Sequence, residues 1–233
     1  MAKSQIIKDL ANSSIDTMTA LKRAKVILSE FDNEDIMNWI NYEIVGYPED
    51  ANLPSYRKTK GHLVASYFKG SMANCMVFEN ISISLGKMPD EFQEKILNIQ
   101  FRESVNALNH LLNNSKNNEN IWQHIPADFF PAISKYNNDP NMIITSATVY
   151  IGSQIINDIF SIIENKLLDI LMLLEKEFGN LDELDLDTTS KSSDELQTIT
   201  DKIVVIIYND NSITIGNENK IKNSNIASKI ENL

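Results

Sequence analysis

One cluster of acidic and aromatic residues has types and spacing that could do chemistry. Its members lie three or four positions apart, so on a helix they share one face: Trp39, Tyr42, Glu43 and Tyr47. The Glu43 carboxylate, beside stacking rings and with Arg23 or Arg57 as a positive partner, could act as a general acid or base or contact a ligand. The alternative is structural: Trp39 anchors the core, Glu43 forms a salt bridge with one of those arginines, and Tyr47 closes the helix end. The spacing leaves both interpretations open.

Other catalytic arrangements are incomplete in this sequence. Two E-x-K triplets, Glu164-Asn165-Lys166 and Glu218-Asn219-Lys220, resemble part of a nuclease metal site, but neither follows a strand preceded by an acidic residue. The flanking motifs of Ser/His/Asp hydrolases are absent. We therefore assign no catalytic residue, and we lean away from an enzyme without excluding one.

Glycine, cysteine and histidine usage excludes several classes of site. No two of the seven glycines lie closer than nine positions, whereas dinucleotide turns, phosphate loops and nucleophile elbows each need two glycines within about five positions. The single cysteine, Cys75, fits a reducing compartment and forms no zinc motif, and His62, His110 and His124 are widely spaced. We expect no metal and no cofactor.

The charge distribution bears on partners and location. The net charge of −11 argues against nucleic-acid binding, because affinity for phosphates rests on clustered lysine and arginine. Residues 179–201 hold seven acids and one lysine, which predicts a solvated acidic linker. The N-terminus lacks a signal-peptide pattern, and no apolar run approaches the roughly 18 residues of a membrane span. We expect a cytoplasmic protein without a membrane partner.

Hydrophobic periodicity predicts an α+β fold, in which an N-terminal helical hairpin or three-helix unit packs with a small, mostly antiparallel sheet and a long C-terminal helix. The predicted helices cover residues 4–11, 14–31, 32–46, 89–112 with a break near Gln100, and 154–178. The predicted strands cover residues 61–85, as two or three strands, and 142–151. Asp32 is expected to cap the third helix and Gly46 with Pro48 to end it, while Pro54 keeps the next segment a loop. Residues 121–136 are expected to be irregular but packed over the sheet.

The sequence divides into an α+β body (1–178, with a helical motif region, 1–60, and a sheet-plus-helix region, 61–178), the acidic linker (179–201) and a tail (202–233). The tail opens with KIVVIIY, a β-prone run, and continues with isoleucines among Asn, Gly and Ser, which predicts short strands.

Such a tail cannot bury its apolar face alone, so we expect it to oligomerise the chain or, alternatively, to dock on its own domain. The helix over 154–178 is apolar on more than one stripe, which is typical of a central core helix or of a helix that packs against a second copy.

Three segments resemble the AbiTii domain of bacterial abortive-infection proteins: LKRAKVIL at 21–28, WINYEIVGYP at 39–48 and LPSYR at 53–57. The family pattern has an R-K-A-K-like helix, then a W-[VI]-x-x-E-[LI]-x-G-Y helix end, then L-P-x-Y-R. The chain departs from it in having Ile-Val before Gly46, where members often have Leu-Asn. The resemblance makes these positions candidate binding or family-motif residues: Arg23, Trp39, Glu43, Tyr47, Tyr56 and Arg57. Gly46, Pro48 and Pro54 are candidate structural positions.

The resemblance implies a role in prokaryotic antiphage defence, in which an infected cell stops growing or dies before phage mature. It supplies no catalytic residues. Our first hypothesis is therefore a protein that acts through self-assembly and protein interaction, as a homo-oligomer formed through the helix 154–178, the tail 202–233 or both. One alternative is a toxin enzyme acting on nucleic acid or a nucleotide through a Glu43-centred site. Another is a phage-sensing module that binds a phage protein or works with a neighbour-encoded effector.

Overall fold

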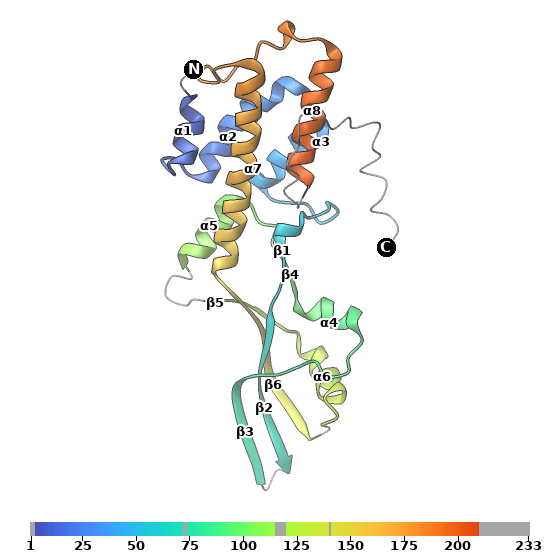
Figure 1. The fold of residues 1–233 in the computed structure, drawn as a ribbon. Helices are drawn as coiled ribbons and strands as arrows, with labels where there is room; N and C mark the ends of the chain where they lie inside the picture. The colour runs from blue at the N-terminus through green and yellow to red at the C-terminus, as the bar shows by residue number, and fades with distance from the viewer. Residues whose placement is uncertain (1–2, 72–73, 115–119, 140, 210–233) are drawn as a thin grey trace.

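The computed structural model describes residues 3–71, 74–114, 120–139 and 141–209. It confirms the α+β fold: most helices gather at one end of the molecule, and a four-stranded antiparallel sheet extends away from them (Figure 1). We call residues 58–100 and 120–152, which hold every described strand, the strand arm. The helices outside it form the helix bundle.

Local capping explains where the bundle helices begin. The bundle contains α1 (Gln5–Ala11), α2 (Thr17–Leu28), α3 (Glu34–Val45), α5 (Val105–Asn114), α7 (Gln154–Phe178) and α8 (Ser193–Tyr208), with 3-10 turns η1 (Ser29–Phe31), η2 (Ser55–Arg57) and η5 (Thr188–Ser190). The Asp16 side chain caps α2, and the Asn33 side chain accepts a hydrogen bond from Ile36 N at 3.0 Å to cap α3. The prediction of Asp32 as this cap is wrong by one residue, because Asp32 adopts a left-handed conformation and Asn33 has the extended backbone of an N-cap.

α7 runs through the centre of the bundle and spans the predicted residues, Gln154 to Phe178. Helices α1, α2, α5 and α8 pack against it, so that a broad face of α7, which includes Ile156, Ile163 and Leu171, is fully buried. α7 ends at Gly179, where φ is +91°, as glycine permits. Of the apolar positions that suggested a second copy, Ile156, Leu167 and Leu171 are buried within this chain, whereas Met172 is 38% exposed, so packing against a second copy stays a prediction.

The strand arm is built from long-range pairing. Its main sheet has the order β3-β2-β6-β5, all antiparallel, from β2 (His62–Ser71), β3 (Asn74–Ser82), β5 (Asn120–His124) and β6 (Met142–Gly152). A second sheet pairs β1 (Lys58–Lys60) with β4 (Asn98–Gln100), and the arm also carries α4 (Asp90–Leu97), η4 (Ala127–Phe129) and α6 (Phe130–Tyr136). The prediction for residues 121–136 is partly wrong: their first residues form an edge strand on β6, and Trp122 is 53% exposed rather than packed. Pairing with a strand some thirty positions away leaves no local signal.

The predicted strand at Lys202–Tyr208 is wrong, because these residues form the second half of α8. Ser192 and Glu195 make a reciprocal capping box that starts the helix. Ile199, Ile203 and Ile207, spaced by four, are buried where α8 packs on α3 and α7. Tertiary burial of this stripe outweighs the β preference of the valine and isoleucine run.

The segment predicted as a solvated linker is also partly structured. Leu181 and Leu186 are buried in the core, and α8 begins at Ser193, within residues 179–201. The rest of the tail, residues 210–233, lies outside the described residues, so its predicted strands and its role in oligomerisation stay predictions. Among the helices of the described segments, none combines the length and apolar character that a membrane crossing requires.

Candidate functional site

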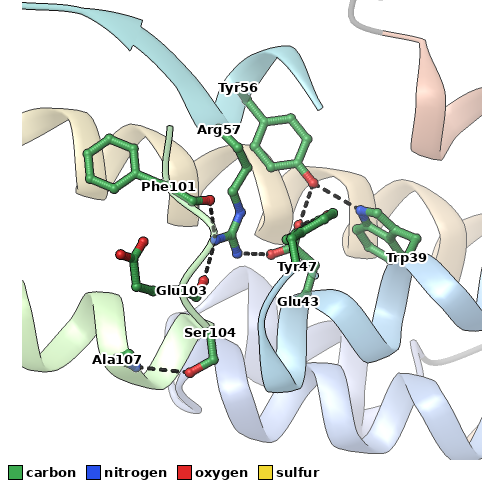
Figure 2. A network of polar contacts seen from close by, with 9 residues as sticks. All are labelled: Trp39, Glu43, Tyr47, Tyr56, Arg57, Phe101, Glu103, Ser104 and Ala107. Carbon is green, nitrogen blue, oxygen red and sulfur yellow. Dashed lines mark hydrogen bonds and ion pairs between the residues drawn. The ribbon is translucent and has the colours of Figure 1, made fainter. Parts of the chain in front are cut away.

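Five of the six candidate residues meet at the junction of the bundle and the arm (Figure 2). Trp39 and Glu43 lie one turn apart on α3, and Tyr47 follows just beyond its C-terminal end. Tyr56 and Arg57 come from η2, whose turn after Pro54 brings them back over α3. We call these five residues the Glu43 network.

Glu43 is the centre of the network. Its Oε1 accepts hydrogen bonds from the hydroxyls of Tyr47 and Tyr56, both at 2.6 Å. Its Oε2 accepts a hydrogen bond from Arg57 Nη2 within an ion pair whose two side chains are 0% exposed. The prediction that Glu43 forms a salt bridge with Arg23 or Arg57 is therefore confirmed, with Arg57 as the partner.

Arg57 ties the network to a segment that sequence reasoning missed. Its Nη1 donates to the backbone carbonyls of Phe101 and Glu103, at 3.3 and 2.5 Å. The backbone of the same segment also bonds to the network, because Phe101 N donates to Arg57 O and Tyr47 N donates to Arg102 O. These contacts use main-chain atoms, so no residue type between 101 and 104 could have indicated them.

Trp39 and Lys166 complete the surroundings of Tyr56. Trp39 Nε1 donates to the Tyr56 hydroxyl at 2.9 Å, and the Lys166 ammonium lies 5.8 Å from the Tyr56 ring centroid. Lys166 Nζ also donates to Ile206 O and Asn209 O at the C-terminal end of α8. This lysine belongs to one of the E-x-K triplets, and its role here is to hold α8 against α7.

Burial sets the protonation of the two tyrosines. Burial, and next the adjacent Glu43 carboxylate, raises the pKa of Tyr47 and of Tyr56 well above the ordinary tyrosine value. Both hydroxyls therefore stay protonated near neutral pH and remain donors to Glu43. The network depends on this donor state.

The candidate structural positions Gly46, Pro48 and Pro54 lie in the turns next to Tyr47 and Arg57. Gly46 has a φ of +106°, and a Cβ built there would lie 3.0 Å from Arg102 O. Only glycine combines that backbone with so close an approach. The carbonyl of Pro48 accepts a hydrogen bond from Arg102 Nη1, and the carbonyl of Pro54 accepts one from Arg57 N.

Arg23 is the candidate that the structure does not bring to the network. It lies on α2 and pairs with Asp9 of α1, Nη1 to Oδ2 at 3.1 Å, with a partly exposed side chain. That pair links two neighbouring helices at the surface. It contributes nothing to the surroundings of Glu43.

The geometry of the Glu43 network fits a brace rather than a reaction site. Both carboxylate oxygens are occupied by donors, and no part of Glu43 or Arg57 reaches solvent. Across the described ranges, no group of three or more His, Cys, Asp or Glu side chains is placed to hold a metal ion. A groove of about 650 Å³ lies instead on the strand arm, between α6 and β6, and is lined by residues that include Phe130, Lys135 and Met142.

Comparison with known proteins agrees with the motifs of the network. The AbiTii family model matches residues 4–199, a range that contains all six candidate residues and the start of α8. No curated protein and no solved structure matches the chain. The family's name points to abortive infection, a defence of bacteria against phage. Because the match covers most of the sequence, the chain belongs to the AbiTii family.

Proposed function

We propose that this AbiTii member defends a bacterium against phage as a scaffold that assembles with copies of itself in the cytoplasm, where its free Cys75 thiol stays reduced. In this proposal the Glu43 network holds the arm to the bundle and takes no part in a reaction. Expression of this chain alone then suffices for defence.

The observation that carries the proposal is the apolar surface of the strand arm. Of the twelve large hydrophobic residues exposed on the described surface, six lie on its strands: Phe68, Met76, Val77, Ile81, Trp122 and Ile143. Three of them, Phe68, Val77 and Ile143, are neighbours across the sheet, and contiguous exposed apolar side chains are typical of surfaces that bind another protein. By contrast, the acidic and aromatic cluster, the best candidate for catalysis, is closed to a substrate.

The arm replaces the helix as the proposed contact surface. One broad apolar face of α7 is buried by its own chain, and so are three isoleucines of α8, while Met172 is the one large hydrophobic residue of α7 that is exposed. Residues 210–233 remain a second predicted element of assembly.

The test is phage plaquing together with survival of infected cells, in a host that expresses this chain alone from an inducible promoter. We expect fewer plaques and arrest or death of infected cells. Normal plaquing at confirmed expression of folded chain would contradict the proposal and favour a sensing module that needs a separate effector.

A double variant separates a scaffold from an enzyme. Glu43→Gln combined with Arg57→Met removes the carboxylate and its counter-charge together, which avoids leaving one charge buried without a partner. If the variant folds and still protects, Glu43 has no chemical role. Loss of protection by a variant with an unchanged circular dichroism spectrum and melting temperature would contradict the scaffold proposal.

A further inference from the structure

β3 is an edge strand that is open along its length. All of its nine residues except Phe78 are exposed, and in the sheet formed by the described residues no strand lies beyond it. An edge strand presents unpaired backbone N–H and C=O groups, which are a template for pairing with another chain. Figure 1 shows β3 at the end of the arm farthest from the bundle.

The edge carries little protection against such pairing. β3 contains no proline and no lysine or arginine, and Glu79 is its one charged residue. A bulge interrupts its ladder near Asn80, which has a positive φ. From Asn74 to Phe78, however, the pairing with β2 is regular. The exposed Met76 and Val77 lie in this regular part.

An apolar row crosses the sheet and ends at this edge. Val77 lies opposite Phe68, and Phe68 lies opposite Ile143, so the three side chains stand side by side on one face, and all three are exposed. Met142 and Ile144, on the other face, are buried beside α6. At this level of the sheet α6 covers one face of β6, whereas the row on the other face is open up to the edge of β3.

The distribution of charge favours a second copy of the chain as the partner. The strand arm carries six lysines and six Asp or Glu residues, so it is neutral, and the remaining residues hold the whole net charge of −11. Two copies repel each other through their acidic bundles and approach most easily arm to arm. The regular part of β3, from Asn74 to Phe78, has no charged residue, so no like charges oppose an identical segment.

We propose that β3 pairs with β3 of a second copy, antiparallel, about a two-fold axis at Met76. This proposal rests on the self-assembly proposed above and names its contact. The two sheets join into one of eight strands, and the Val77–Phe68–Ile143 row continues into the partner's row. Each Cys75 faces the partner's Val77, which makes the two Cys75 residues diagonal neighbours, about 7–8 Å apart.

The area of this contact predicts its strength. With the axis at Met76, residues 74–78 of one copy pair with the same residues of the other, over a length of about 17 Å. A sheet is about 10 Å thick, so the contact buries about 170 Å² per copy, against about 800 Å² for a stable complex. The dimer is therefore weak and depends on concentration. Assembly then responds to a local rise in the amount of the chain.

Sedimentation velocity of the full chain, over a wide range of concentrations, tests the contact. The variant is Val77→Lys, which places two lysines close together at the two-fold axis. Its matched control is Val26→Lys on α2, because Val26 is 51% exposed and Val77 57%, so both variants carry the same charge change at an exposed valine. We expect the wild type and Val26→Lys to dimerise alike, and Val77→Lys to dimerise at least about tenfold more weakly.

Cys75, the single cysteine of the chain, reports the register without engineering. A short bismaleimide should capture dimers of the wild type and of Val26→Lys, and few of Val77→Lys. Equal self-association of all three chains, or association without capture at Cys75, would overturn the β3 contact and leave assembly through another surface. A wild type that stays monomeric throughout would also overturn it, whereas the plaquing assay tests the defence function separately.

Discussion

Glu43 and Arg57 form an ion pair with both side chains fully shielded from solvent. Glu43 receives two further hydrogen bonds from tyrosines, and Arg57 donates two to main-chain carbonyls. The pair thereby joins the end of α3, the η2 turn and the segment before α5. Breaking it should loosen the junction between bundle and arm.

Removing one partner of this pair should destabilise the chain strongly. Arg57→Met leaves the Glu43 carboxylate buried without its counter-charge, and we expect a loss of about 3–5 kcal/mol in the free energy of unfolding, measured with urea. Arg23→Met, which breaks a partly exposed pair, should cost no more than about 1 kcal/mol. Equal effects of the two substitutions would show that the buried pair is not a brace.

Tyr56 should matter more than Tyr47, although both donate to the same oxygen of Glu43. The Tyr56 hydroxyl also accepts from Trp39, so Tyr56→Phe leaves the buried Trp39 Nε1 unsatisfied, whereas after Tyr47→Phe Glu43 Oε1 still accepts from Tyr56. Each unsatisfied group costs about 1–3 kcal/mol, and thermal or urea unfolding of the two variants should differ accordingly. A larger loss for Tyr47→Phe would contradict this order.

The chain should lose stability in alkali. Burial, and then Glu43, raises the pKa of Tyr47 and Tyr56 in the folded state, while in the unfolded chain these hydroxyls titrate near pH 10. Above that pH the unfolded state releases protons that the folded state keeps. Stability is therefore fully present below pH 10 and falls as pH rises, by up to about 1.4 kcal/mol per pH unit for each of the two tyrosines.

Urea unfolding between pH 9 and pH 11 measures that slope, and Tyr47→Phe should make it shallower. Tyr208 adds to the loss in the same direction: burial, and then Asp35, raises its pKa to about 12, so its contribution disappears between pH 10 and pH 12. A free energy of unfolding that is flat or rising above pH 10 would be inconsistent with buried, protonated tyrosines.

Substitution of Gly46 and of Gly179 by alanine separates the cost of backbone strain from the cost of steric crowding. Both have a positive φ that disfavours alanine, but a Cβ at Gly46 would meet Arg102 O at 3.0 Å, whereas at Gly179 nothing lies within 4 Å. Gly46→Ala should therefore cost more than Gly179→Ala, by about 1 kcal/mol or more in thermal unfolding. Similar costs would mean that the Gly46 turn can shift away from Arg102.

Local signals determined much of this fold. Apolar residues spaced by three and four positions predicted the helices α2, α3 and α7. Gly46 and Gly179 predicted where α3 and α7 end. Within the site, helical spacing put Trp39, Glu43 and Tyr47 together. It could not choose between Arg23 and Arg57, because that choice depends on how the turn after Pro54 folds back over α3.

Tertiary contacts decided the rest. The KIVVIIY run is β-prone by local preference, and it is helical because α3 and α7 bury one of its faces. β5 exists because β6 offers it a partner, and Arg57 is held by carbonyls that any residue type would provide. Where the hydrophobic pattern is periodic and local, the sequence by itself determined which segments are helical and which are extended. It also determined which residues form the AbiTii motif. Only the tertiary structure decided that the Glu43–Arg57 pair is shielded from solvent and that β3 is open, because burial and strand pairing depend on residues far apart in the chain.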